Sequence, residues 1–322
     1  MKNFKTISTI IFYTIIIFIF LDIVILRHCC HFGIVAIDTY GSDKSDRKYQ
    51  PYFEFMNGHI LKNNTSTDNI EFFQEDNRIK VALFGGSTGL PLDEGIFSET
   101  LAKYLAKEVQ VVNFSCSSAS HRQHLHMILE VLPKYNPDII IFYGGYNETI
   151  QHYLYEPRPG FPYNYYYKHD TPPLLQFLIE NSALFSTIEM RYRSLTNYKK
   201  LAAEYNVFSE EYNQKIIDKY FETLMLAKNV TSTLQSKEYG NTKFIAFYQP
   251  YRVPEYFEES NKRIEDKIKN IDYIFDVHDE YKNFDDSIWI DYCHVKDEPE
   301  VTKHIIDVLS KTTAEYVSKS KT

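Results

Sequence analysis

Three residues able to carry out acyl transfer lie far apart in this chain. Ser87 follows the short apolar run 81–84, inside the stretch 85–89 (GGSTG), and Asp291 and His294 form an Asp-x-x-His pair near the other end. A serine hydroxyl becomes a nucleophile when an imidazole takes its proton, and a carboxylate fixes the tautomer of that imidazole. The sequence therefore predicts Ser87 as a nucleophile, His294 as its base and Asp291 as the orienting carboxylate.

A fourth chemically useful residue closes another apolar run. Asn147 lies in the stretch 145–148 (GYNE), directly after the apolar residues 138–143. A side-chain amide in such a place can donate a hydrogen bond to an oxyanion. Taken singly, Ser87 and Asn147 are equally well interpreted as turn residues, and the stretch around Ser87 lacks the lysine of a phosphate-binding loop. Their combination with the Asp-x-x-His pair favours catalysis.

A regular alternation of strands and helices must position these residues. Strands are predicted from apolar runs, and helices from amphipathic patterns that separate them. The predicted strands are 81–84, 109–114, 138–143, 242–248 and 272–277, and the predicted helices are 93–107, 119–135, 210–236, 255–269 and 298–319. Such an order is typical of a three-layer α/β/α fold with a central, mostly parallel five-stranded sheet.

The amino-terminal part of the chain predicts a membrane anchor. Residues 6–26 carry a single charge, Asp22, and 21 apolar residues in a helix match the thickness of a bilayer core. This length favours an uncleaved signal anchor over a cleaved signal peptide, whose apolar region is shorter. We therefore assign residues 1–27 to a transmembrane helix, 28–78 to a juxtamembrane lead-in and 79–322 to the catalytic domain.

The charges that flank the anchor give its expected orientation. Lys2 and Lys5 favour a cytoplasmic amino terminus, although Arg27, Lys44 and Arg47 on the other side oppose it. The expected arrangement is a single-pass membrane protein with its catalytic domain outside the cytoplasm.

The motifs resemble those of the SGNH (GDSL-type) hydrolase superfamily over roughly residues 80–319. Residues 85–88 resemble the family's nucleophile block, residues 145–148 resemble its Gly-x-Asn-Asp block with a glutamate in the last place, and residues 291–294 match its Asp-x-x-His block. The resemblance implies a flavodoxin-like fold. It also implies that Ser87 is the nucleophile and that Asn147 donates its amide to the oxyanion.

The second block departs from the family pattern. Family members place there a glycine whose backbone N–H completes the oxyanion hole, whereas the loop 113–118 ends in two serines here. A serine can donate the same N–H if the loop adopts the required backbone dihedrals. The resemblance therefore implies an oxyanion hole of Ser87, Ser118 and Asn147, with its geometry in question at Ser118.

A tyrosine-rich insertion at 151–205 interrupts the alternation. Because it follows the third predicted strand, we expect it above the carboxyl ends of the strands, where ligands bind in such sheets. Predicted substrate contacts are Tyr146, Tyr163 and Tyr165, together with Arg122, which follows the second-block loop. The alternative is an insertion packed on the surface around a small core of its own.

Other reactive residues predict no additional site. His121, His124 and His126 have no carboxylate at ligand spacing, so we expect surface or supporting histidines and no metal. Cys116 and Cys293 fall in two of the predicted site loops, which leaves both free thiols and a disulfide bridge open. No cofactor is expected.

The net charge of −8 and the pI near 5.8 argue against a nucleic-acid partner. Three functions remain. The first is a serine esterase that cleaves an acyl ester, such as an O-acetyl group, on a cell-surface glycan. The second is an O-acyltransferase that modifies an envelope polysaccharide through the same acyl-serine. The third is a catalytically silent glycan-binding protein.

Overall fold

The computed structural model describes residues 2–20, 22, 47–50, 54–57, 73, 77–116, 119–130, 132–154, 157–160, 172, 174, 177–178, 182, 185, 203–296 and 298–319. The chain forms two compact units. One comprises Met1–Ser45 and Tyr165–Leu201, and the other comprises Asp46–Asn164 and Ala202–Thr322. The predicted catalytic residues all belong to the second unit.

The first unit contains the helix α1 (Lys2–Ile19), whose large apolar side chains are mostly exposed. Asp22 is buried, and its carboxylate accepts a hydrogen bond of 2.8 Å from the Ser182 hydroxyl. Within the described residues, no helix combines the length and the hydropathy that a membrane crossing requires. Residues 21 and 23–26 of the predicted anchor lie outside the described residues.

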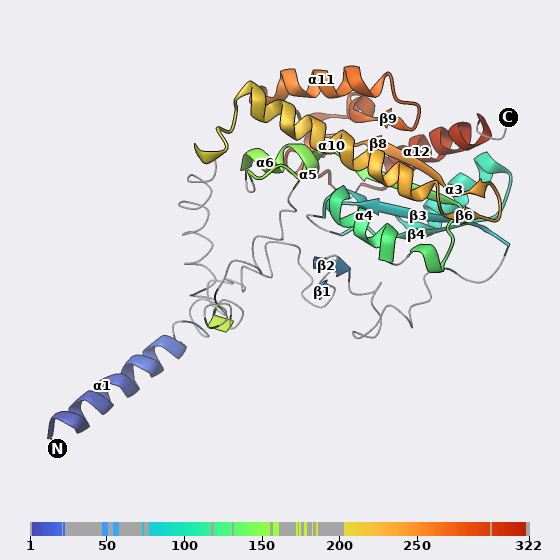
Figure 1. Ribbon diagram of the computed structural model, residues 1–322. Helices are drawn as coiled ribbons and strands as arrows, with labels where there is room; N and C mark the ends of the chain where they lie inside the picture. Colours follow the sequence, from blue (N-terminus) through green and yellow to red (C-terminus); the bar gives the residue numbers. More distant parts are fainter. Residues whose placement is uncertain are drawn as a thin grey trace. The chain divides into compact units, whose positions relative to one another are not determined.

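The second unit is built on a five-stranded parallel sheet, which confirms the predicted sheet (Figure 1). Its strands are β3 (Ile79–Gly85), β4 (Val109–Asn113), β5 (Ile139–Gly144), β8 (Lys243–Tyr248) and β9 (Ile274–Asp276). Their order in the sheet is β4-β3-β5-β8-β9. The chain adds β4 on one side of β3 and then β5 on the other side of β3. The direction in which strands are added therefore reverses between β3 and β5. Ligands bind in open α/β sheets at such a point.

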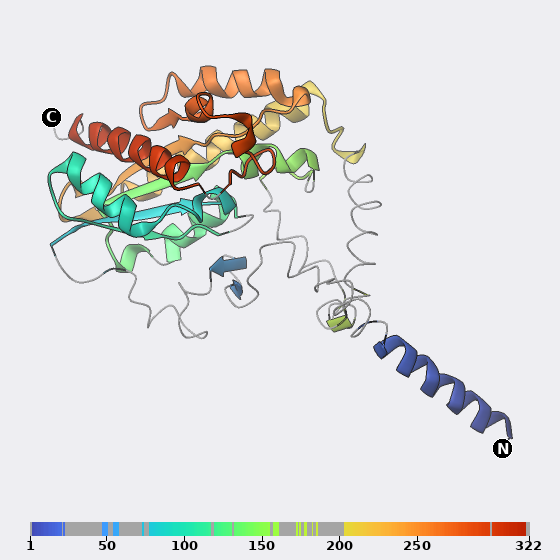
Figure 2. The same ribbon diagram turned by 180° about the vertical axis from the view of Figure 1, so that it is seen from behind.

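Helices cover both faces of this sheet (Figures 1 and 2). One face packs against α4 (His121–Glu130), α10 (Glu210–Thr231) and α11 (Glu258–Ile268), and the other packs against α3 (Glu94–Leu105) and α12 (Pro299–Lys319). The Asp93 carboxylate caps α3 by accepting a bond of 2.8 Å from the Ile96 N–H, as its position in the sequence predicts.

The remaining elements are short. Two-stranded antiparallel ribbons are formed by β1 (Arg47–Gln50) with β2 (Glu54–Asn57) and by β6 (Gln235–Ser236) with β7 (Gly240–Asn241). The short α-helices α5 (Tyr146–Thr149) and α6 (Gln151–Leu154) follow β5. Single turns of 3₁₀-helix are η3 (Ser87–Gly89), η4 (Leu132–Lys134), η6 (Glu255–Phe257), η7 (His278–Tyr281) and η8 (Asp286–Ile288).

Two predicted helices are shorter than expected. The helix predicted at 119–135 ends at Glu130 and is followed by η4, because Pro133 has no N–H for an α-helical hydrogen bond. The helix predicted at 210–236 ends at Thr231, and the chain then turns back through β6 and β7. Gly240 allows this turn with a φ of 76°.

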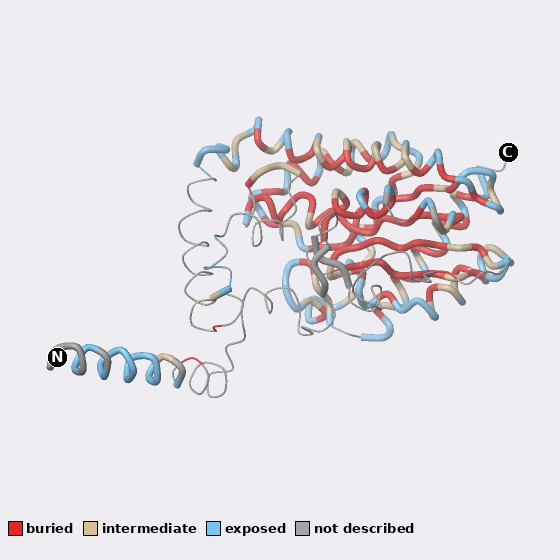
Figure 3. Tube along the Cα trace, turned by 60° about the horizontal axis from the view of Figure 1, so that its bottom comes forward, coloured by how far each residue is buried: buried red, intermediate tan, exposed pale blue. Residues whose placement is uncertain are grey.

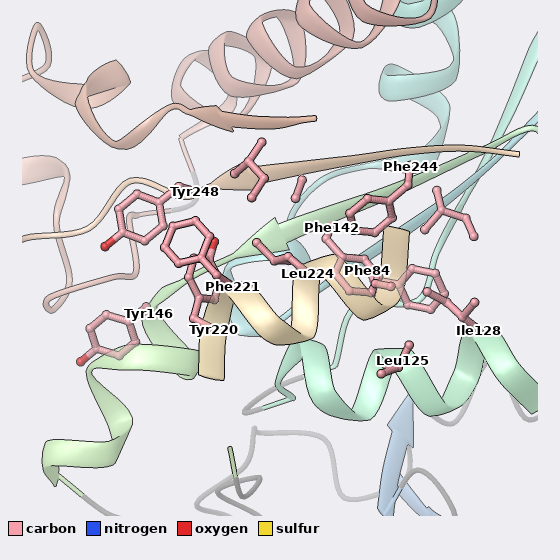
Figure 4. Packing of buried hydrophobic residues seen from close by; sticks show 14 of the residues in the cluster. Phe84, Leu125, Ile128, Phe142, Tyr146, Tyr220, Phe221, Leu224, Phe244 and Tyr248 are labelled. Carbon is pink, nitrogen blue, oxygen red and sulfur yellow. The ribbon is translucent and has the colours of Figure 1, made fainter. Parts of the chain in front are cut away.

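The strands alternate their side chains between two cores, so both faces of the sheet are buried (Figure 3). Figure 4 shows Phe84, Phe142 and Phe244 on neighbouring strands, facing α4 and α10. The rings of Phe84 and Phe142 lie 5.6 Å apart in an edge-to-face arrangement. This packing makes the strand ends rigid platforms for the loops that follow them.

A buried carboxylate, Asp138, holds the amino-terminal ends of the strands together. One of its oxygens accepts a bond of 2.9 Å from the Lys80 N–H. The other accepts bonds from the Ser236 hydroxyl at 2.6 Å and the Glu238 N–H at 3.1 Å. Asp138 therefore joins the starts of β3 and β5 to the β6–β7 ribbon. These contacts lie at the amino-terminal ends of the strands, opposite to the carboxyl-terminal ends that carry the predicted site.

Candidate active site

The structure brings Ser87, His294 and Asp291 into one hydrogen-bonded line. Ser87 is the first residue of η3, two residues beyond the end of β3. Its Oγ lies 2.6 Å from His294 Nε2, and His294 Nδ1 lies 2.7 Å from Asp291 Oδ2. With the ring proton on Nδ1, the imidazole donates to the carboxylate and accepts from the serine hydroxyl. This arrangement can remove a proton from Ser87 and hold the positive charge that results.

The loop that carries the base owes its shape to Asp291. The second oxygen of this carboxylate, Oδ1, accepts the backbone N–H groups of Cys293 and His294, each at 2.8 Å. Such a turn needs a short acidic or amide side chain at its first position. An antiparallel bridge between Trp289 and Val295 closes the loop. The spacing of the Asp-x-x-His pair therefore follows from one side chain that builds the turn and orients the ring.

The electrostatics of this loop favour an ionised orienting carboxylate. Partial burial raises the pKa of Asp291, but the backbone N–H groups of Cys293 and His294 and the imidazole of His294 lower it, and the net effect is a pKa below its ordinary value. The side chains of His294 and Asp291 are 37% and 49% exposed. The base is thus accessible from solvent, as a group that exchanges protons with substrate and water must be.

Asn147 lies against the backbone that precedes the nucleophile. Its Nδ2 donates a bond of 2.8 Å to the Ala119 carbonyl, and its Oδ1 accepts one of 2.8 Å from Gln151 Nε2. An amide nitrogen carries two hydrogens, so the second one remains for an oxyanion. A Cβ built on Gly86 would come within 2.4 Å of Asn147 Nδ2. Gly86 is therefore required for this contact, a role that the sequence pattern did not identify.

The loop after β4 packs against the nucleophile turn. Asn113 Nδ2 donates to the carbonyls of Gly89 at 2.9 Å and Leu92 at 3.0 Å, and the Cys116 N–H donates to the Gly85 carbonyl at 3.0 Å. These bonds fix the loop beside η3. Ser118, predicted to donate to the oxyanion, lies outside the described residues, so its role stays a prediction.

A contact from β8 also reaches the nucleophile turn. The Thr88 hydroxyl donates a bond of 3.1 Å to Gln249 Oε1, and the Gln249 N–H donates to the Gly144 carbonyl at 2.8 Å. Gln249 is buried. Gln249 therefore links the ends of β5 and β8 to Thr88, the residue after Ser87. The sequence alone did not indicate this role, because Gln249 and Thr88 lie far apart in the chain.

The histidines of α4 correct one sequence prediction. His121 and His124 are buried, at 0% and 2% exposure, and only His126 is exposed. Positions 121 and 124 lie on one helical face, and that face packs on the sheet, where His121 stacks 4.6 Å from the ring of Phe142. Burial lowers the pKa of His121 to about 3, so its imidazole is neutral in this environment.

Tyr146, predicted to contact substrate, is part of a buried core cluster, and its contact with substrate stays a prediction. It is 8% exposed, and its ring lies 5.6 Å from that of Tyr251 in an edge-to-face arrangement. Figure 4 shows its ring beside α5. Arg122 is half-buried at the start of α4. Tyr163 and Tyr165 lie outside the described residues.

Cys116 and Cys293 are both buried, and no disulfide joins them. Cys293 Sγ lies 3.5 Å from His294 Nδ1, and ligand atoms of Asp291, Cys293 and His294 lie within 4.8 Å of one another. Burial raises the pKa of the Cys293 thiol, which disfavours the thiolate that a metal would need. The imidazole and carboxylate of this group already share the hydrogen bond described above.

No protein-family model matches this chain, and no curated protein matches it. Similar folds occur among solved structures. An acetylxylan esterase from Geobacillus stearothermophilus aligns with a TM-score of 0.37 and 14% identity, over 74% of this chain and 94% of that one. A family 3 carbohydrate esterase from Clostridium thermocellum aligns with a TM-score of 0.37 and 12% identity, over 76% and 98%. At such values, the chemistry of this chain has to be argued from its own residues.

Proposed function

We propose that this protein is a serine esterase of the SGNH type. The observation that carries the proposal is the line of two hydrogen bonds, 2.6 Å and 2.7 Å long, from Ser87 through His294 to Asp291. Ser87 Oγ attacks the ester carbonyl while His294 Nε2 takes the serine proton, and Asp291 stabilises the imidazolium that forms. The free amide hydrogen of Asn147 and the Ser87 N–H donate to the oxyanion.

The second half of the reaction reuses the same groups. The tetrahedral intermediate collapses as His294 returns the proton to the leaving alcohol, which leaves an acyl group on Ser87. Water then enters, gives its proton to His294 and releases the acid. This sequence needs a base that both alcohol and water can reach, and the partly exposed His294 ring meets that requirement.

The proposed substrate is an O-acyl ester, such as an acetyl group, on a surface glycan. Two side chains next to the orienting carboxylate are strongly exposed, Ile290 at 67% and Tyr292 at 55%, and Leu90, three residues after Ser87, is 41% exposed. Exposed aromatic and aliphatic groups beside an accessible base suit a bulky alcohol such as a sugar better than a small buried ligand.

The location of the enzyme belongs to the same proposal. Attachment to a membrane through the apolar segment at residues 6–26, with the catalytic unit outside the cytoplasm, would place the site near a cell-surface glycan. The exposed apolar side chains of α1, including Ile10 and Phe12 at 60% each, support an apolar environment for this helix. Recovery of the full chain in membranes, and its release only by detergent, would test this part.

The experiment for the activity is labelling of the full chain with a fluorophosphonate, beside hydrolysis of p-nitrophenyl acetate. The wild type should form an adduct, Ser87→Ala and His294→Ala should not, and Ser318→Ala, a change on the exposed side of α12, should label like the wild type. No adduct dependent on Ser87 would refute the esterase and leave the silent glycan-binding alternative. Turnover that rises with added oligosaccharide would indicate transfer to a sugar.

A further inference from the structure

The carboxylate of Glu148 lies between the turn after β5, which leads to Asn147, and the start of α4. Its Oε2 accepts the Gly145 N–H at 2.8 Å, in the turn that leads from β5 into α5. Its Oε1 accepts the His121 N–H at 2.6 Å, at the start of α4. The Glu148 side chain therefore joins the turn at Gly145 to the start of α4 at His121, 27 residues before Glu148 in the sequence.

The same two segments are joined a second time by Asn147. This residue follows Gly145 and donates through Nδ2 to the carbonyl of Ala119, two residues before His121. The bond to Ala119 takes one amide hydrogen and so determines where the other one points. If the turn after β5 and the start of α4 moved apart, the Ala119 bond would lengthen and the free hydrogen would lose its direction.

The turn held by Glu148 has a backbone conformation that needs support. Gly145 has a φ of 129°, which an L side chain rarely adopts, and a Cβ there would lie 2.5 Å from the ring of Tyr248. Strand β5 ends one residue earlier, so the Gly145 N–H bonds to Glu148 and not to a neighbouring strand. The carboxylate thus replaces the missing strand partner at the point where the chain turns toward Asn147.

We propose that Glu148 is a positioning residue that holds the turn after β5 and the start of α4 at the separation required for Asn147 to donate to the oxyanion. The inference rests on the proposed esterase function. Glu148 transfers no proton and touches no substrate, since both of its oxygens face backbone N–H groups inside the protein. A carboxylate is suited to this task because it accepts at both oxygens, whereas an amide accepts at only one.

Burial of the Glu148 carboxylate costs free energy, because the charged form is removed from water. Glu148 is 9% exposed, and burial raises the pKa of its carboxyl although the N–H groups of His121 and Gly145 oppose that effect. Removing a buried charge from its partners is destabilising wherever it occurs. The test must therefore separate a loss of oxyanion geometry from a general loss of stability.

Asp138 provides the matched control. It is also a buried carboxylate that accepts two backbone N–H groups, but it lies at the amino edge of the sheet, away from Ser87. Glu148→Gln and Asp138→Asn each replace one acceptor oxygen with an NH₂ group. Both should lower the melting temperature of the full chain, whereas only Glu148→Gln should lower kcat, by about 100-fold as expected for a lost oxyanion donor, with KM changed less than about threefold.

A double-variant cycle with Asn147→Ala identifies the route of the effect. If Glu148 acts through Asn147, adding Glu148→Gln to Asn147→Ala should lower kcat by no more than about threefold beyond Asn147→Ala alone. Independent losses that multiply, or a kcat for Glu148→Gln within about threefold of the wild type, would overturn the inference. If Glu148→Gln does not fold, Glu148→Asp keeps the charge but shortens the reach by one methylene, and its kcat should fall about tenfold or more; a kcat within about threefold of the wild type would equally overturn the inference.

The outcome for the proposed function is read separately. A wild type without Ser87-dependent turnover refutes the esterase itself, before any variant at Glu148 is measured. A wild type that turns over, together with a fully active Glu148→Gln, refutes only the positioning role.

Discussion

Two of the histidine–carboxylate pairs in the second unit, His294 with Asp291 and His121 with Glu148, combine the same chemical groups in different surroundings. In the loop pair, His294 and Asp291 are 37% and 49% exposed and lie 2.7 Å apart. In the buried pair, the side chains of His121 and Glu148 are 1% and 7% exposed, and His121 Nδ1 lies 3.6 Å from Glu148 Oε1. The difference supports the proposal that the first pair transfers protons and that the second supports the backbone.

The reason is the way each carboxylate uses its two oxygens. Asp291 gives one oxygen to backbone N–H groups and keeps the other for the imidazole, which can then accept a proton from Ser87. Glu148 gives both oxygens to backbone N–H groups, and burial lowers the pKa of His121 to about 3. A histidine whose pKa burial lowers this far binds a proton too weakly to act as an effective base near neutral pH.

The largest expected effect comes from removing the nucleophile or the base of the Ser87–His294–Asp291 line. Ser87→Ala or His294→Ala should lower kcat for p-nitrophenyl acetate by about 10⁴-fold or more, because the oxyanion donors and substrate binding alone remain. His126→Ala, an exposed histidine of α4, should leave kcat unchanged. Activity within about tenfold of the wild type in His294→Ala would assign the base to another residue.

A second test separates orientation from turn formation at Asp291. Asp291→Asn keeps an oxygen for the two backbone N–H groups but turns an NH₂ group toward His294 Nδ1, which favours the wrong tautomer. We expect kcat to fall about 10³-fold, with a melting temperature within a few degrees of the wild type. A large drop in melting temperature with little loss of kcat would reverse the assignment.

A third test probes the close approach of Gly86 to Asn147. Gly86→Ala would bring a Cβ within 2.4 Å of Asn147 Nδ2, so the amide must move and the oxyanion donor is lost or misdirected. kcat should fall by about 100-fold with little change in KM. Gly95→Ala, where the nearest atom to a new Cβ is the flexible Asp93 carboxylate at 3.2 Å, should retain full activity.

The smallest expected effect concerns the buried pair and appears in stability. Burial lowers the pKa of His121 to about 3 and that of His124 well below its ordinary value. Between these values and about 6.5, the unfolded chain binds more protons than the folded one, so stability is lost as the pH falls below about 6.5. The raised pKa of Glu148 acts in the opposite direction above about 4.5 and reduces this loss.

Thermal unfolding of the full chain at pH 7, 6 and 5 measures this effect. One such histidine contributes at most about 1.4 kcal/mol per pH unit. His121→Gln should therefore make the melting temperature fall less steeply with decreasing pH. An unchanged slope would mean that His121 is protonated, or reached by water, in the folded state.

Sequence predicts best those features that depend on local physics. The strands were found because apolar β-branched runs such as 138–143 are buried on both faces, and the observed β5 (Ile139–Gly144) is shifted by one residue. The Asp-x-x-His turn was visible because its hydrogen bonds span three residues. Helix ends were less well predicted, since the packing and turns that end a helix, as after Thr231, are not encoded in its periodicity.

Features that depend on contacts distant in sequence were missed. The burial of Tyr146 was not predicted, because its ring packs against Tyr251, more than a hundred residues later. The burial of His121, and the bridge that Glu148 makes to its N–H, could not be predicted without knowing that α4 and α5 begin after β4 and β5, the two strands that flank β3. The close approach at Gly86 depends on the same juxtaposition.

The turn built by Asp291 has a dynamic consequence. Since one carboxylate both folds residues 291–294 and holds the imidazole, the ring and its partner move as one rigid body when this exposed loop fluctuates. The turn is also joined to Arg252, whose N–H donates a bond of 2.6 Å to the Tyr292 carbonyl. A small shift that lengthens the contact to Ser87 would therefore leave the tautomer of the ring intact, because the bond that sets it lies inside the turn.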